Sequence, residues 1–85
     1  MYFIYFIQSL KNNKVYVGFT SKDIKIRLYE HNKDTNSWTA RNKPFKLVYY
    51  ESYHCEQDAR ARERFYKMGF GKQIKKIIIK TIIGL

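Results

Sequence analysis

The chain has 85 residues, enough to bury one modest core and too few for two, so we expect one domain over residues 1–85. Hydrophobic residues make up 45% of it and aromatic residues 18%, which excludes a disordered polyelectrolyte. The 17 Lys and Arg residues outnumber the 7 acidic ones, giving a net charge of +10. This excess indicates a polyanionic partner, nucleic acid before anionic membrane, although a merely basic soluble domain is the alternative.

The single cysteine, Cys55, cannot form an internal disulfide, which fits a reducing compartment such as the cytoplasm. We expect it to be a small buried or half-buried residue rather than a nucleophile. The apolar start lacks a basic segment and a small-residue cleavage site, so we expect a strand there and no signal peptide. Residues 77–83 are rich in isoleucine, but Lys80 interrupts them and they are too short to cross a bilayer.

The first elements in chain order form a predicted hairpin. Residues 2–8 are rich in aromatic and branched side chains and predict a strand. Residues 10–13 have turn chemistry, since asparagine tolerates the left-handed conformation, and residues 14–20 predict the return strand. A two-residue turn at Asn12 and Asn13 is expected to join them.

This turn determines where two tyrosines lie. With Lys11 opposite Lys14, the numbers of paired residues sum to 25. Tyr16 then shares a face of the sheet with odd-numbered residues, including Tyr5. A shift of one residue would put the two phenols on opposite faces.

A helix is expected to begin near Asp23, capped by Thr20 or Ser21. Four of its residues share one stripe at helical spacing: Ile24, Arg27, Leu28 and His31. Residues 32–44 predict a polar loop, and residues 45–53 predict a third strand.

Two more helices are predicted towards the end of the chain. One covers residues 56–68, with Gly69 as its C-cap and a face that carries Ala59, Glu63 and Tyr66. The other covers residues 72–83, with an apolar stripe of Ile74, Ile77, Ile78 and Ile82. The order β-β-α-β-α-α predicts an α+β domain, a small three-stranded antiparallel sheet flanked by helices.

The available side chains exclude several kinds of catalytic site. No Cys/His cluster has zinc-ligand spacing, no glycine-rich loop can cradle a nucleotide, and only two histidines are available for a triad. A two-metal nuclease needs several converging carboxylates, and no two acids are spaced as D-x-D or D-x-E. Any nuclease chemistry must therefore use one metal ion and few carboxylates.

Tyr5 and Tyr16 are candidate general bases. A phenol has a pKa near 10 and is a poor base at neutral pH, but nearby cations and metal-held water favour its ionised form. The alternative is that tyrosines simply populate strands, where they are common. Gly18, inside a strand pattern, indicates a bulge or a close approach of backbone or ligand.

Arg27 and His31 lie on the inner stripe of the first helix. A guanidinium there can bind a phosphate bidentately, and His31 can donate to the phosphate or transfer a proton. The alternatives are a solvated arginine in a basic chain and a histidine favoured by the negative end of the helix dipole.

Glu63 is the candidate metal ligand. A hard divalent ion such as Mg²⁺ can be held by one carboxylate together with waters and phosphate oxygens. The alternative is an ordinary helix ion pair with Lys67 or Arg60, which contributes only tenths of a kcal/mol.

Basic residues along the chain are candidates for phosphate contacts. We single out five as nucleic-acid-binding: Lys22, Arg41, Lys43, Arg60 and Lys67. The wider basic surface is expected to include Lys25, Lys46, Arg62, Arg64, Lys72, Lys75 and Lys76. Trp38 can stack on a base or cover the edge of the core.

Residues 4–7 (IYFI), 13–18 (NKVYVG) and 27–31 (RLYEH) together resemble the core of the GIY-YIG nuclease superfamily, in its small stand-alone bacterial branch. The likeness extends to residues 37–41, 46–51 and 61–64 and implies the same order of elements. It also implies an active site with one divalent ion, Mg²⁺ or Mn²⁺, on Glu63. A motif tyrosine, Tyr5 or Tyr16, would activate water and Arg27 would bind the phosphate, with His31 at a position that is commonly His or Tyr.

The chain departs from the family pattern at two positions. Its first motif reads Phe3-Ile4-Tyr5, so the glycine is replaced, which need not affect chemistry because glycine has no side chain to contribute. Phe19 follows Gly18 where some relatives carry lysine or a small polar residue. This leaves open which group lowers the tyrosine pKa.

The leading hypothesis is a metal-dependent endonuclease that hydrolyses DNA, in DNA repair or recombination, by a single-metal mechanism. RNA is not excluded as a substrate, no membrane partner is expected, and a homodimer is possible. The alternative is a non-catalytic basic nucleic-acid-binding module on the same fold. A third reading is a membrane-surface protein that uses the C-terminal Ile/Lys helix.

Overall fold

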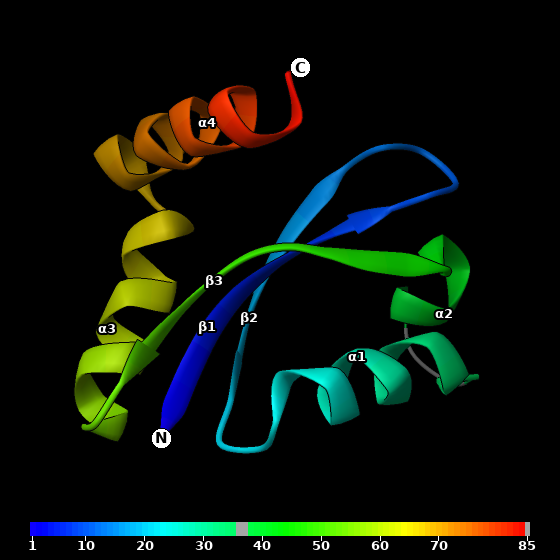
Figure 1. The fold of residues 1–85 in the computed structure, drawn as a ribbon. Coiled ribbons are helices and arrows are strands. Elements are labelled where there is room, and N and C mark those ends of the chain that lie inside the picture. Colours follow the sequence, from blue (N-terminus) through cyan, green and yellow to red (C-terminus); the bar gives the residue numbers. More distant parts are fainter. Residues whose placement is uncertain (36–37, 85) are drawn as a thin grey trace.

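The computed structural model describes residues 1–35 and 38–84. The strands are β1 (Tyr2–Ser9), β2 (Val15–Thr20) and β3 (Phe45–Tyr53), and the helices are α1 (Ile24–Lys33), α2 (Trp38–Asn42), α3 (Glu56–Tyr66) and α4 (Gly69–Ile83). The strands form an antiparallel sheet in the order β2-β1-β3 (Figure 1). The predicted class and element order are confirmed, with the short helix α2 inside the segment that was expected to be a loop.

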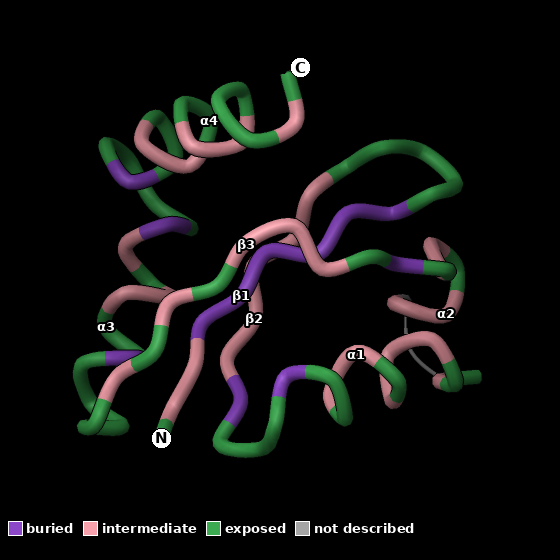
Figure 2. The backbone as a smooth tube through the Cα atoms, viewed as in Figure 1, coloured by how far each residue is buried: buried purple, intermediate pink, exposed green. Residues whose placement is uncertain are grey.

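Residues 4–9 of the central strand β1 are all buried, at odd and even positions alike (Figure 2). Side chains alternate along a strand, so its apolar run serves two cores. Ile4 and Phe6 pack with Ala59 and Tyr66 on the side covered by α3 and α4. The other face carries a second cluster, composed of Tyr5, Ile7, Ile24 and Phe45, on the side of α1.

The hairpin register differs from the prediction, since the numbers of paired residues sum to 23 rather than 25. Tyr5 lies opposite Gly18, and Ile7 lies opposite Tyr16. A difference of two residues keeps every side chain on its face, because the side-chain period of a strand is two. The prediction that Tyr5 and Tyr16 share a face is therefore confirmed although the register was wrong.

The register changes because the loop is longer than two residues. The Ser9 amide donates to the Lys14 carbonyl at 2.9 Å, so the loop spans residues 10–13. Asn13 has a φ of 63°, in the left-handed region that asparagine tolerates. The buried Ser9 hydroxyl donates to the Asn42 carbonyl at 2.5 Å and so attaches this loop to the end of α2.

Both predicted helix caps are wrong. Asp23 caps α1, in place of Thr20 or Ser21, because its carboxylate accepts a hydrogen bond from the backbone two residues later at 2.8 Å. Gly69 does not end α3 but opens α4, with a φ of 45°. Cys55, which was expected to be buried or half-buried, is exposed at the start of α3.

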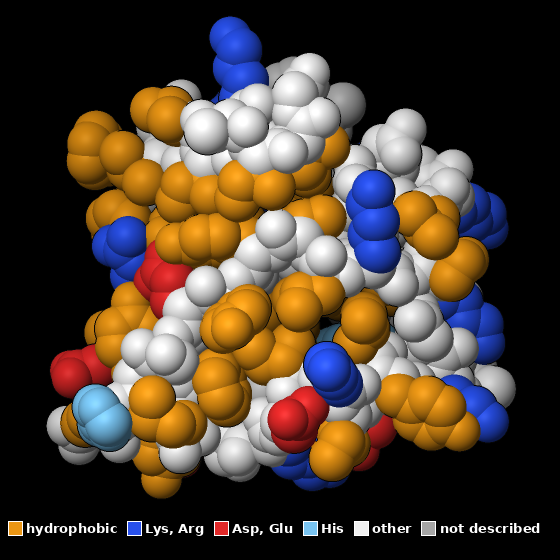
Figure 3. Space-filling view, in the orientation of Figure 1, with side chains coloured by type: hydrophobic (Ala, Val, Ile, Leu, Met, Phe, Trp, Pro, Cys, Tyr) orange, Lys and Arg blue, Asp and Glu red, His pale blue; other side chains and the backbone are white. Residues whose placement is uncertain are grey.

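The inner face of α4 is rotated relative to the predicted stripe. Ile74, Ile78 and Ile79 pack on the core, whereas Ile77 and Ile82 are 60% and 49% exposed. The helix also begins three residues before the predicted start. Figure 3 shows hydrophobic side chains extending from α4 over the visible face of the sheet. None of the helices in residues 1–35 and 38–84 has the length and apolar character needed to cross a bilayer.

A half-buried carboxylate joins β3 to α3. Glu51 accepts hydrogen bonds from Tyr49 (2.7 Å), Tyr53 (2.5 Å), Tyr66 and the Nε of Arg62 (3.1 Å). Burial raises the Glu51 pKa, but the three phenol hydrogen bonds and the Arg62 charge outweigh burial, so this pKa lies below its ordinary value. Burial and the bond to Glu51 raise the pKa of Tyr53 to about 12. The network keeps the carboxylate ionised and the phenols protonated.

We expect Glu51→Gln to lower the free energy of unfolding by about 2–3 kcal/mol at pH 7, because a neutral amide replaces a charged acceptor. The folded-state pKa of Glu51 is depressed, so its contribution is present above the unfolded-state value of about 4.3 and is lost as the pH falls through the folded-state pKa. Urea unfolding at pH 7 and pH 3 measures this difference. Glu56→Gln, at an exposed ion pair on α3, is the control. An equal loss at both pH values would contradict the prediction.

Candidate active site

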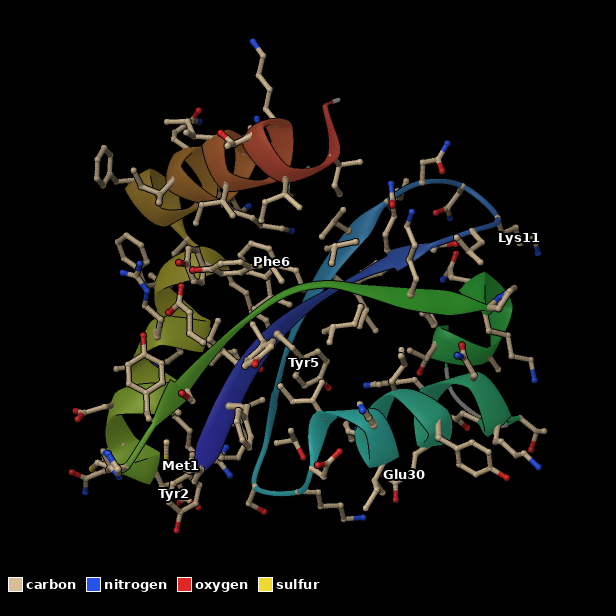
Figure 4. The ribbon with its side chains drawn as sticks, viewed as in Figure 1. Met1, Tyr2, Tyr5, Phe6, Lys11 and Glu30 are labelled. Atoms are coloured by element: carbon tan, nitrogen blue, oxygen red, sulfur yellow. The ribbon has the colours of Figure 1, made fainter. Side chains whose placement is uncertain are left out.

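Tyr5 and His31 meet on the α1 side of the sheet, where Figure 4 shows Tyr5 and Phe6 on opposite sides of β1. The Tyr5 Oη lies 2.8 Å from His31 Nε2, and the two rings meet edge to face at 5.9 Å. Arg27, one helical turn before His31, lies close enough to Tyr5 to interact with it through charge and hydrogen bonding. The predicted stripe of α1 therefore brings both basic side chains to one phenol.

Gly18 makes room for the Tyr5 ring. A Cβ atom at position 18 would lie 2.4 Å from the Tyr5 Oη and Cζ atoms, which is far inside van der Waals contact. The ring therefore lies across the β2 backbone at the residue that pairs with it. This confirms the close approach predicted from a glycine within a strand.

Burial sets the protonation states of this pair. Burial raises the Tyr5 pKa, and the opposing charge of Arg27 does not reverse the shift. Burial and the Arg27 charge lower the His31 pKa. At neutral pH the pair is therefore a neutral phenol and a neutral imidazole, and Tyr5 is the donor in the tautomer that leaves Nε2 unprotonated. The expected stabilisation of the phenolate by nearby cations is outweighed in the protein alone.

Glu63, on α3 at the other side of the sheet, acts on the same phenol through its charge. Its negative charge contributes to the raised Tyr5 pKa. The side chain is 20% exposed and forms an ion pair with Lys67, whose Nζ lies 3.1 Å from a carboxylate oxygen. Of the two pairings considered from sequence, the one with Lys67 is present, while Arg60 pairs with Glu56.

Tyr16 is half-buried beside the Tyr5 cluster. Its ring packs edge to face against Phe45 with the centroids 5.8 Å apart. It also lines a cavity between β2 and α4. Tyr16 thus borders the candidate site, whereas Tyr5 makes the hydrogen bond to His31.

Residues 1–77 match the family model of the GIY-YIG catalytic domain. The chain belongs to the GIY-YIG family. The fold is therefore of the nuclease type, which implies a nucleic-acid substrate, and GIY-YIG nucleases generally depend on a divalent metal ion. No curated protein and no solved structure matches the chain.

The donor atoms of this GIY-YIG site fit one loosely anchored metal ion. Within the described residues no group of three or more His, Cys, Asp or Glu side chains could hold a metal together. Glu63 offers a partly exposed carboxylate, and Mg²⁺ commonly binds one or two carboxylates while keeping waters and phosphate oxygens. The residues fit such an ion and do not fit a closed zinc site.

The predicted nucleic-acid-binding residues of the GIY-YIG chain do not form one patch. Arg41 and Lys43 lie in or just after α2, whereas Arg60 lies in α3 and Lys67 caps the end of α3, on the other side of the sheet (Figure 1). Lys22 is bonded to Glu30 at 2.7 Å. The predicted role of Trp38 concerns a side chain that lies outside the described part of the structure.

Glu30 is a site residue that the sequence analysis missed. Its carboxylate accepts a bond from Arg27 Nη1 at 3.2 Å as well as from Lys22. The hydrogen bonds from Lys22 and Arg27 lower the Glu30 pKa. An acid three residues after an arginine in a predicted helix was the available signal. The contact orients the guanidinium beside Tyr5.

We expect Gly18→Ala to cost about 1–3 kcal/mol of stability, because the methyl group overlaps the Tyr5 ring. Displacing the ring breaks the bond to His31 and exposes the imidazole, so the His31 pKa should rise towards about 6.5. Denaturant unfolding and an NMR titration of His31 measure both effects. In a Tyr5→Ala background the same change should cost little, and equal costs in both backgrounds would contradict the clash.

Proposed function

We propose that the protein is an endonuclease that hydrolyses DNA phosphodiester bonds with one divalent metal ion. The observation that carries this proposal is the 2.8 Å hydrogen bond between Tyr5 and His31, because the charges of Arg27 and Glu63 also act on this phenol. The Tyr5 phenol thus forms a hydrogen bond with a proton acceptor, and it interacts electrostatically with a phosphate-binding cation and a metal-binding carboxylate.

Tyr5 and His31 together supply the base. Since a buried phenol is a weak base alone, the neutral imidazole takes the Tyr5 proton at Nε2 as the Tyr5 oxygen takes a proton from water. The resulting hydroxide attacks the phosphorus atom, and the leaving oxygen is protonated from solvent. Tyr16, at the border of the site, is the second candidate base.

Arg27 binds the phosphate. Its guanidinium has five N–H donors, more than the contacts with Glu30 and Tyr5 require. Two parallel donors match two phosphate oxygens, and their charge opposes the negative charge that develops during attack. The bond to Glu30 holds the guanidinium in place before the substrate binds.

Glu63 would hold the metal ion, Mg²⁺ or Mn²⁺. When bound, the ion supplies positive charge to the phosphate and the leaving oxygen. The ion pair between the Glu63 carboxylate and the Lys67 ammonium must break before Glu63 can bind the metal ion. This exposed pair is weak, so its exchange has little cost.

A non-catalytic nucleic-acid-binding module is the second candidate. It is supported by the net charge of +10 together with the Glu63–Lys67 pair, which neutralises the metal-binding carboxylate. In this reading Glu63 stabilises α3 and takes no part in chemistry. Binding that needs no Mg²⁺ and is unaccompanied by strand breaks would favour it.

We expect the wild type to nick supercoiled plasmid with Mg²⁺ or Mn²⁺ and not with EDTA. Glu63→Ala and Arg27→Ala should each lower the nicking rate about 100-fold or more, as loss of one charged transition-state contact does in other enzymes. Glu56→Ala, an exposed acid on the same helix as Glu63, should leave the rate unchanged. Undiminished nicking by purified Glu63→Ala protein would refute the assignment.

The nicking rate should depend on the protonation of His31. Because only neutral imidazole accepts the Tyr5 proton, the rate should fall tenfold per pH unit below the His31 pKa, which lies under its ordinary value of about 6.5. The measurement is the initial rate from pH 4.5 to pH 8 for the wild type and for His31→Gln. The variant should be slower and lack the acid limb. An identical acid limb in both proteins would exclude His31 as the proton acceptor.

A further inference from the structure

A cavity of about 460 Å³ lies between β2 and α4, a size typical of ligand sites. Because β2 is an outer strand of the sheet, no further strand in residues 1–35 and 38–84 covers its edge on this side. The lining is formed by Asn13, Val15, Tyr16, Val17, Tyr66, Lys67, Lys72, Lys75, Lys76 and Ile79. The cavity therefore joins the edge of the sheet to the inner face of α4.

Four of the lining residues are lysines, and none is acidic. Lys75 is half-buried and donates to the Val15 carbonyl at 2.8 Å. Burial and the charges of Lys72 and Lys67 lower the Lys75 pKa, so these ammonium groups are close enough to repel one another. A concave surface with this imbalance attracts an anion, which would relieve the repulsion.

The remaining walls are mostly apolar. Val15, Val17 and Ile79 are partly buried and pack against the core cluster on this side of the sheet, and Tyr16 and Tyr66 are the other two lining residues with apolar bodies. An apolar wall beside several cations is complementary to a ligand with a flat apolar part and a phosphate. A nucleotide has both, and nucleic-acid-binding grooves combine base stacking with phosphate contacts in this way.

We propose that this cavity binds one nucleotide of the DNA strand held at the candidate active site, with its base on the apolar wall and its phosphates on the lysines. The inference rests on the proposed function. Two residues make the cavity continuous with that site: Tyr16 borders both, and Lys67 reaches from the cavity to Glu63. A strand, rather than a free nucleotide, fits this continuity.

Lys67 connects occupation of the cavity to the state of Glu63. Its Nζ is 3.1 Å from the Glu63 carboxylate while Lys67 also lines the cavity. A phosphate in the cavity competes for this ammonium and draws it from the carboxylate. Substrate binding would thereby free Glu63 for the metal ion.

The test is binding of a fluorescent single-stranded oligonucleotide, followed by anisotropy in EDTA over a range of salt. Lys72→Gln/Lys76→Gln removes two exposed cations of the cavity, and Lys33→Gln/Lys80→Gln removes equal charge elsewhere. The slope measured is that of the logarithm of the binding constant against the logarithm of the salt concentration. We expect its magnitude to fall by about 0.7 per lost contact in the cavity variant, and by less in the control. The wild type should bind an otherwise identical abasic strand about fivefold or more weakly.

Equal losses in the two double variants would overturn the proposal, because bulk charge would then explain binding. Two competitors test which ligand the cavity takes. If adenosine monophosphate displaces the labelled strand as well as unlabelled strand does at an equal concentration of nucleotide, the site is for a free nucleotide. If polyglutamate is equally effective, the ligand is an acidic peptide. Either result overturns the strand as ligand. Melting curves of both variants verify folding.

Plasmid nicking separates this proposal from the proposed function. If the wild type nicks plasmid and the cavity variant binds DNA as the control variant does, the cavity proposal is rejected and the nuclease proposal stands. If binding depends on the cavity but the wild type never nicks plasmid, the nuclease proposal is rejected and the nucleotide-binding cavity stands.

Discussion

The alternation of side chains along β1 is the constraint on which the rest of the structure depends. Phe6 and its even-numbered neighbours anchor α3 and α4, while Tyr5 and its odd-numbered neighbours anchor α1. One strand thus positions the helix that carries Arg27 and, through the opposite face, the helix that carries Glu63. The candidate site can form only because both helices pack against the same central strand.

The chemistry follows from how deeply Tyr5 is placed. Its ring occupies the space above Gly18, and this burial makes the phenol harder to ionise. The same burial makes His31 harder to protonate, so the two shifts together favour a phenol that hands its proton to a neutral acceptor. A single desolvated environment therefore prepares both partners of the proposed relay, and the neighbouring charges adjust it.

The sequence predicts the features that depend on periodicity within one element and misses those that depend on contacts between residues distant in sequence. The face shared by Tyr5 and Tyr16 survives an error in register, because a shift of two residues preserves parity. The stripe with Arg27 and His31 follows from helical spacing within one element.

The errors share a physical cause, which is that neighbours distant in sequence decide them. The inner face of α4 depends on how α3 delivers the chain, so Ile77 and Ile82 point away from the core although their spacing resembled a core stripe. Glu51 gathers three phenols and Arg62 from two elements, which no local pattern indicates. The cavity beside α4 likewise needs β2 and α4 to be placed together.

The bond from Lys75 to the Val15 carbonyl has a consequence for solubility. An outer strand presents unpaired backbone groups that invite a strand from another molecule, and natural sheets often protect such edges with lysine. Here the ammonium occupies an acceptor of β2, and α4 stands beside that edge. The last helix thereby hinders pairing of the β2 edge with a strand of another molecule, while the cavity at the same edge leaves room for a charged ligand.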